Sequence, residues 1–119
     1  MSRFAENFED LEVWQEARRL ANLIFDHFEE LRVYGFRDQI LNSSTSVTNN
    51  IAEGFDRRTK KDFAHFLDIA KGSSGEVRPM LYLAEDRNYI NQNEAMPIRQ
   101  SYLILSSRIR SLAASLRKG

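Results

Sequence analysis

The sequence predicts an all-α protein, folded as an up-down-up-down antiparallel four-helix bundle. Two observations support this: apolar residues recur at steps of three and four along four stretches, and the connections between those stretches are short. Hydrophobic residues make up 42% of the chain, enough for one core, while five glycines and two prolines in 119 residues are few for a turn-rich all-β fold. We expect a single domain over residues 1–119.

The first two helices are expected over residues 11–32 and 36–53. From Leu11 onward, apolar residues recur in heptad steps at Val13, Ala17, Leu20, Ile24 and Leu31, and then at Phe36, Ile40, Val47 and Ile51. Tyr34-Gly35 separates the two helices. Gly54 follows the second one, at a position where a left-handed glycine commonly ends a helix.

The last two helices are expected over residues 60–90 and 94–117. Their heptad positions are Phe63, Leu67, Ala70, Val77, Leu81 and Ala84, and then Ile98, Tyr102, Leu105, Ile109, Leu112 and Leu116. Pro79 is expected to kink the third helix without ending it. Pro97 is expected in the first turn of the fourth helix, where a missing N–H is tolerated.

Several function classes are disfavoured. The chain has no cysteine, and its two histidines, His27 and His65, fall on different helices, so we expect no metal and no cofactor. It has neither a nucleophile-elbow motif nor a phosphate-binding loop, which indicates that it is not an enzyme. An acidic N-terminus and a longest apolar run of only residues 80–84 predict no signal peptide, no membrane contact and a cytoplasmic location.

Small polar residues gather in the middle of the second and third helices. They are Ser43, Ser44 and Ser46 on the second, and Gly72, Ser73, Ser74 and Gly75 on the third. In an antiparallel bundle we expect these patches to face each other and to allow a close approach of the helices. The alternative is a polar pocket edged by Asn50, Glu53 and Glu76, which a small hydrolase using Glu53 would require.

The basic residues give the best functional lead, because charge is divided unevenly. Residues 1–56 contain 11 acids and 5 bases, a net charge of −6, and residues 57–119 contain 6 acids and 12 bases, a net charge of +6. Arg57, Arg58, Lys60 and Lys61 form a cluster, and Arg99, Arg110 and Arg117 form a stripe on the fourth helix. Such cations neutralise phosphates without reading base sequence. The competing explanation is a solvated face with ion pairs to the acidic first helix.

The first and third helices also carry more apolar residues than one buried face requires. The extra residues are Trp14, Phe25 and Phe28 on the first helix and Phe66, Ile69 and Leu83 on the third. Where these residues cannot all face one core, we expect the excess to form subunit contacts. The alternative is a wide face buried beneath neighbouring helices.

Two motifs resemble those of a known family. Residues 11–17 (LEVWQEA) resemble the opening of the four-helix-bundle proteins named for 23S rRNA intervening sequences. Residues 50–54 (NIAEG), followed by Arg58 and by residues 66–73 (FLDIAKGS), resemble their central part, and Glu76 stands where the family has a glutamate. The resemblance covers roughly residues 8–115. It assigns structural roles in the family pattern to Trp14, Asn50, Glu53, Gly54, Gly72, Ser73 and Glu76.

The resemblance implies a left-handed bundle that assembles as a homopentamer in bacteria, with no enzymatic activity attached to the family. A related branch, the accessory proteins of diversity-generating retroelements, binds nucleic acid and a reverse transcriptase. We therefore expect a non-enzymatic oligomeric bundle that binds RNA or a nucleoprotein partner and has no small-molecule substrate. The alternatives are a protein–protein scaffold without a nucleic-acid role and, less favoured, the small hydrolase that uses Glu53.

Overall fold

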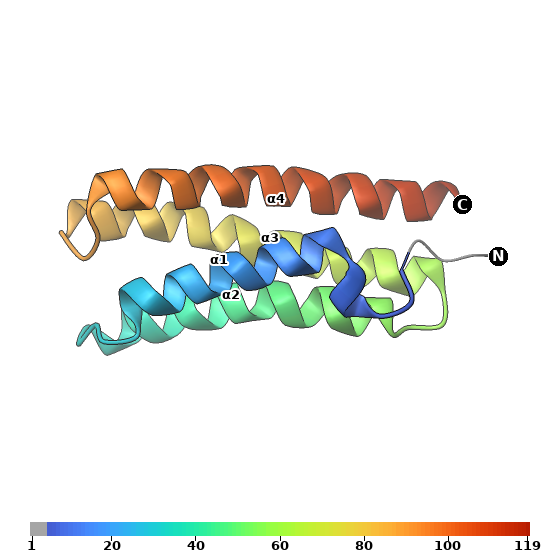
Figure 1. The fold of residues 1–119 in the computed structure, drawn as a ribbon, viewed down its shortest axis with the longest axis horizontal. Helices are drawn as coiled ribbons and strands as arrows, with labels where there is room; N and C mark the ends of the chain where they lie inside the picture. Colours follow the sequence, from blue (N-terminus) through green and yellow to red (C-terminus); the bar gives the residue numbers. More distant parts are fainter. Residues whose placement is uncertain (1–4) are drawn as a thin grey trace.

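The computed structural model describes residues 5–119, and these residues form helices and their connections, without a strand. A short 3-10 helix, η1 (Phe8–Asp10), precedes four α-helices, which are α1 (Glu12–Phe28), α2 (Tyr34–Phe55), α3 (Lys60–Asp86) and α4 (Gln92–Lys118). The helices pack side by side in a bundle 50 Å long and 21 × 19 Å across (Figure 1). The predicted four-helix bundle is confirmed. Residues 1–4 of the expected domain lie outside the described residues.

The core lies between the four helices and consists mainly of the predicted heptad residues. The largest fully buried side chains are Tyr102, Phe28, Leu20, Ile24, Ile40, Ile51, Leu67, Leu81, Leu105 and Ile109. Burial of one such aliphatic side chain contributes roughly 1.5–3 kcal/mol relative to its exposure. Phe28 is completely buried, so the alternative of a wide buried face holds for this residue.

The third helix ends at Asp86, earlier than the expected residue 90. Asn88 adopts a left-handed backbone conformation with φ of 62°, which asparagine tolerates better than most residues. The N–H groups of Asn88 and Tyr89 donate to the carbonyl oxygens of Glu85 (3.1 Å) and Ala84 (2.8 Å), respectively. This Schellman arrangement provides hydrogen-bond donors for backbone carbonyl groups at the end of the helix, and it turns the chain toward α4.

The fourth helix begins earlier than expected because Asn91 caps it. The Asn91 side chain accepts a hydrogen bond from the N–H of Asn93 at 2.8 Å. Pro97 therefore lies in the second turn of α4, not in the first, and it removes the hydrogen bond that the Asn93 carbonyl would accept. The third helix continues through Pro79 without ending.

Gly54 lies inside the last turn of α2, so the expected left-handed helix end is wrong. No glycine within residues 5–119 has a positive φ. A Cβ at this position would lie 2.7 Å from the Cβ of Phe66 and 3.2 Å from the backbone oxygen of Phe63. The missing side chain thus allows the end of α2 to pack against the start of α3.

The serines in the middle of α3 divide between its two neighbours. Ser73 faces α2, where its Oγ lies 2.8 Å from the Oγ of Ser46. Ser74 faces α4, where its Oγ lies 2.6 Å from the Oγ of Ser106. The expected contact between small polar residues of α2 and α3 therefore holds for Ser73, and Ser74 joins α3 to α4 instead.

Gly72 and Gly75 do not pack against α2, which corrects the expectation for these two residues. A Cβ at either position would meet no atom within 4 Å. Both glycines lie on the surface of α3. The close approach of helices within the bundle does not need them.

Alanine is expected to have opposite effects on stability at a glycine packed against a neighbouring helix and at a glycine that faces open space. Gly54→Ala is expected to destabilise the bundle by about 1–3 kcal/mol, because its methyl group overlaps the backbone and side chains of α3. Gly75→Ala is expected to stabilise it by about 0.5–1 kcal/mol, because alanine is preferred in a helix interior and the methyl group enters open space. Urea unfolding followed by circular dichroism measures both, and changes of the same sign would contradict this packing.

Candidate functional site

Three of the cations that the sequence singled out are held in ion pairs. Arg57 pairs with Glu53 at 2.7 Å, Arg99 with Glu85 at 2.7 Å, and Arg117 with Asp68. The pair of Arg57 joins the last turn of α2 to the following loop, and the guanidinium carbon lies 4.7 Å from the centroid of the Phe66 ring. Part of the charge of the predicted cluster is therefore neutralised within the chain.

The ion pair of Arg99 is largely buried. The side chains of Arg99 and Glu85 are 12% and 11% exposed, and Nε and Nη2 donate to the two carboxylate oxygens at 2.7 and 3.2 Å. The guanidinium carbon lies 4.0 Å from the centroid of the Tyr82 ring. The hydrogen bond to Glu85 raises the pKa of Arg99. Arg99 links α3 to α4, so we leave it out of the candidate surface.

Arg117 and Asp68 form a second link between α4 and α3. Both side chains are about half exposed, and the two Nη groups of Arg117 donate to the two carboxylate oxygens of Asp68. The hydrogen bonds lower the pKa of Asp68 and raise that of Arg117. Arg117 lies in the last turn of α4.

The other predicted cations are exposed. Arg58, Lys61 and Arg110 form no ion pair within residues 5–119. Lys60 lies beside the C-terminal Gly119, where a Cβ would be 2.9 Å from its Nζ. Arg58, Lys60 and Lys61 thus gather at the connection between α2 and α3, and we call these three residues the end cluster.

Sequence reasoning missed two cations of α3, Lys71 and Arg78. Both line a groove between α3 and α4, with Arg110 also in its lining. The signal was present in the sequence, because residues seven apart lie two turns along the same face of a helix. Within the described residues neither forms an ion pair, and the Nε of Arg78 is buried without a hydrogen-bond partner.

This α3–α4 groove has a volume of about 770 Å³ and a positively charged lining. Besides the three cations it is lined by Asp68, Gly72, Gly75, Leu103, Ile104, Ser106 and Ser107. Asp68 is the one acid in this lining; Arg117 forms hydrogen bonds to it, and Lys71 also interacts with its charge. Three cations therefore face one acid within the groove.

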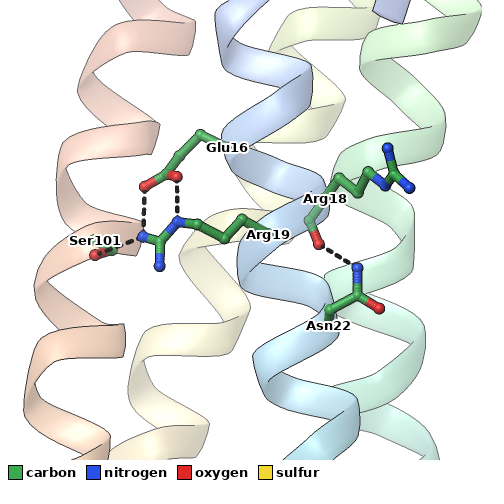
Figure 2. A network of polar contacts seen from close by, with 5 residues as sticks. All are labelled: Glu16, Arg18, Arg19, Asn22 and Ser101. Carbon is green, nitrogen blue, oxygen red and sulfur yellow. Dashed lines mark hydrogen bonds and ion pairs between the residues drawn. The ribbon is translucent and has the colours of Figure 1, made fainter.

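The acidic first helix forms ion pairs mostly away from this groove. Arg19 donates from Nε and Nη2 to the carboxylate of Glu16 at 2.7 and 2.9 Å, and Nη2 lies 3.5 Å from the Oγ of Ser101 on α4 (Figure 2). The hydrogen bond lowers the pKa of Glu16. Arg108 of α4 pairs with Glu12 at 3.0 Å. An ion pair of the expected kind, from the fourth helix to the first, is thus formed by Arg108.

The polar motif residues of α2 and α3 form a seam between these helices. Asn50 donates from Nδ2 to the carbonyl oxygen of Ser46 at 2.9 Å and to its Oγ at 3.0 Å, and this Oγ contacts Ser73. Trp14, at the start of α1, packs edge-on against Phe8 with the ring centroids 5.0 Å apart. These contacts hold neighbouring elements together.

The three residues of the hydrolase hypothesis do not converge. Glu53 is exposed and paired with Arg57, whereas Glu76 accepts a hydrogen bond from the Oγ of Ser43 at 3.0 Å. Ser43 and Glu53 lie ten residues apart on α2, about 15 Å along the helix axis. The hollow that contains Glu76 is lined neither by Glu53 nor by Asn50. No pair of carboxylates is placed here for general acid–base chemistry.

Two further properties concern the part of the chain that the structure describes. Residues 5–119 contain no group of three or more His, Asp or Glu side chains that could hold a metal ion. None of the helices in that range combines the length and the apolar character that crossing a membrane requires.

Comparison with known proteins identifies the family of this chain and a similar solved structure. Residues 9–111 match the family described as 23S rRNA-intervening sequence protein. A crystal structure from Bacteroides thetaiotaomicron VPI-5482, described as a protein of unknown function from the S23 ribosomal protein family, is 26% identical. The alignment covers 90% of this chain and 99% of that chain, with a TM-score of 0.74. No curated protein matches the chain.

The two α3–α4 ion pairs predict unequal effects on stability. Arg99→Ala is expected to lower the free energy of unfolding by about 2 kcal/mol, because it leaves the carboxylate of Glu85 nearly buried and without its donor. Arg117→Ala is the matched control, and its effect is expected to be smaller because solvent reaches Asp68. Thermal unfolding of both variants measures the difference, and equal losses would contradict the structural role of Arg99.

Proposed function

Because the chain belongs to the 23S rRNA-intervening sequence protein family, we propose that it is a non-enzymatic, oligomeric protein that binds RNA through exposed cations of α3, α4 and the α2–α3 connection. A protein that binds RNA meets its ligand in the cytoplasm, so the proposal places it there. The observation that carries the proposal is the distribution of cations that form no ion pair within residues 5–119.

The charge of these cations follows α3 along much of its length. Arg58 lies in the α2–α3 connection and Lys61 at the start of α3, Lys71 and Arg78 follow along the helix, and Arg110 lies on α4. Cations without an acidic partner are free to replace the counterions of a polyphosphate, and the release of those counterions favours binding. A face whose charges were already paired would gain little in this way.

The absence of enzymatic activity in this proposal follows from how the polar residues are used. Glu53, Glu76 and Asn50 are held in separate contacts with Arg57, Ser43 and Ser46. A hydrolase needs an acid or base within hydrogen-bond reach of a substrate and of a second catalytic group. The described residues offer cationic and hydrogen-bonding groups for a polyanion instead.

Subunit contacts are supported by two of the apolar residues that the sequence singled out. Ile69 and Leu83 of α3 are 41% and 55% exposed. Burial of such side chains against a second copy removes apolar area from water. We propose that they lie in the interface of a homo-oligomer, and the family resemblance suggests a homopentamer.

RNA binding is expected to be sensitive to salt and to the end cluster. Arg58→Glu/Lys61→Glu is expected to weaken binding of a labelled single-stranded U20 RNA by roughly tenfold and to flatten its salt dependence, because fewer phosphates are neutralised by the protein. Fluorescence anisotropy at several salt concentrations measures both effects.

The matched control is Arg32→Glu/Arg87→Glu, which makes the same change of charge at the opposite end of the bundle. This control is expected to bind RNA nearly as the wild type does. If wild-type protein shows no salt-sensitive RNA binding, the proposal is wrong and a protein–protein scaffold replaces it. If the two double variants weaken binding equally, the end cluster has no special role.

The molar mass in solution tests whether the protein is an oligomer. Light scattering behind a sizing column is expected to give about 70 kDa, five times the 13.9 kDa of one chain. Ile69→Lys/Leu83→Lys is expected to reduce the mass, whereas the control Val33→Lys, at another exposed apolar residue, is expected to leave it unchanged. A wild-type mass near 13.9 kDa would rule out the oligomer.

A further inference from the structure

The fold gives no reason for Gly72 and Gly75. Both lie in the interior of α3, where glycine is less stable than alanine by about 0.5–1 kcal/mol. Neither has a positive φ, and a Cβ at either position would meet no atom within 4 Å. Their missing side chains therefore open space outside the bundle core, in the lining of the α3–α4 groove.

Half of the residues around this space carry hydrogen-bond donors. Lys71, Arg78 and Arg110 bring positive charge, and Ser106 and Ser107 bring hydroxyl groups. The carboxylate of Asp68 accepts hydrogen bonds from Arg117. The groove thus offers hydrogen-bond donors and positive charge to an anion.

The three cations are spaced along the groove and do not converge on one point. Lys71 and Arg78 are separated by two helical turns, about 10 Å along α3, and Arg110 approaches from α4. The Nε of Arg78 is covered and lacks a hydrogen-bond partner within residues 5–119, so this guanidinium is partly desolvated before any ligand binds. A linear polyanion matches this arrangement better than a single compact anion does.

We propose that the α3–α4 groove is the binding site for a single RNA strand. The phosphates of this strand contact Lys71, Arg78 and Arg110, and its backbone lies over Gly72 and Gly75. This inference rests on the proposed RNA-binding function and names the site that performs it. The axes of packed helices are about 8–10 Å apart, so the groove between them admits one strand and not a duplex. Leu103 and Ile104, 42% and 52% exposed, give the sugars and bases an apolar rim.

The proposed subunit contact borders one side of this groove. At about 100° per residue, Ile69 lies about 160° around α3 from Lys71 and Leu83 lies about 140° from Arg78, but Leu83 lies only about 20° from Gly72. A second copy that covers Ile69 and Leu83 therefore lies next to Gly72 and away from Lys71 and Arg78.

The sharpest test fills the groove without changing its charge. Gly72→Leu/Gly75→Leu places two apolar side chains where the backbone would lie, and leucine favours the helix over glycine. Anisotropy with the labelled U20 RNA is expected to show affinity reduced by roughly tenfold, with the solution mass unchanged and thermal unfolding at or above the wild-type temperature. Purely diffuse attraction between RNA and a basic face predicts wild-type affinity for this variant.

A second variant does not depend on how the leucines pack. Lys71→Gln/Arg110→Gln is expected to reduce the slope of log affinity against log salt by about 0.7 for each phosphate that the variant no longer neutralises. Arg32→Gln/Arg87→Gln, which removes the same charge from the two loops at the far end, is the matched control and is expected to keep the wild-type slope.

The outcomes separate the groove from the proposed function. If the end-cluster variant weakens RNA binding while the leucine and glutamine variants do not, the protein binds RNA but the groove is not the binding site. If wild-type protein binds no RNA, both proposals fail. If the leucine variant changes the solution mass, the groove is a contact between subunits and the inference is overturned. If the leucine variant does not fold, the glutamine pair decides.

Discussion

The alignment of α3 against α4 determines most of what is distinctive in this bundle. Ser74 is fully buried between the two helices, where its hydroxyl lies 2.6 Å from the Oγ of Ser106. On either side of this contact stand the pairs of Arg99 with Glu85 and of Arg117 with Asp68. Hydrogen bonds and ion pairs of this geometry fix the position of one helix along the other, which apolar packing alone specifies less strictly.

The same alignment decides which cations stay uncompensated. The acids of α3 that face α4 lie at the two ends of the seam and are used there by Arg99 and Arg117. Between them the groove lining contains cations, serines and glycines but no further acid. A shift of α4 by one turn would change which cations meet an acid. The alignment of α3 with α4 therefore determines both the packing of the two helices and which surface cations meet an acid.

Periodicity in the sequence was enough to predict the bundle, because burial of apolar side chains is the dominant stabilising term and it repeats with the helix. Helix ends were less predictable, since they depend on single capping residues such as Asn88 and Asn91. Gly54 was misassigned for a different reason. A glycine required by a neighbouring helix has the same local sequence signature as one that ends a helix, and only the position of Phe66 distinguishes them.

The candidate site could be predicted only in part, because charge in a sequence does not show which cations are paired. Arg99 and Arg110 lie on one face of α4, yet Arg99 is nearly buried against Glu85 and Arg110 lines the open groove. Lys71 and Arg78 were overlooked because they stand apart from the dense basic run at residues 57–61. Pairing across helices is a tertiary property, and it depends on the alignment of α3 with α4.

Gly72 and Gly75 reduce the stability of α3 and at the same time keep the groove open. Positions that lower stability without a packing role are expected where a surface serves binding. The most direct test of this view is ultraviolet crosslinking of the protein to single-stranded U20 RNA, followed by mass spectrometry of the crosslinked peptides. We predict crosslinks within residues 68–78 of α3 and 103–110 of α4. Crosslinks confined to α1 and α2, or none at all, would contradict the assignment of RNA binding to the α3–α4 side of the bundle.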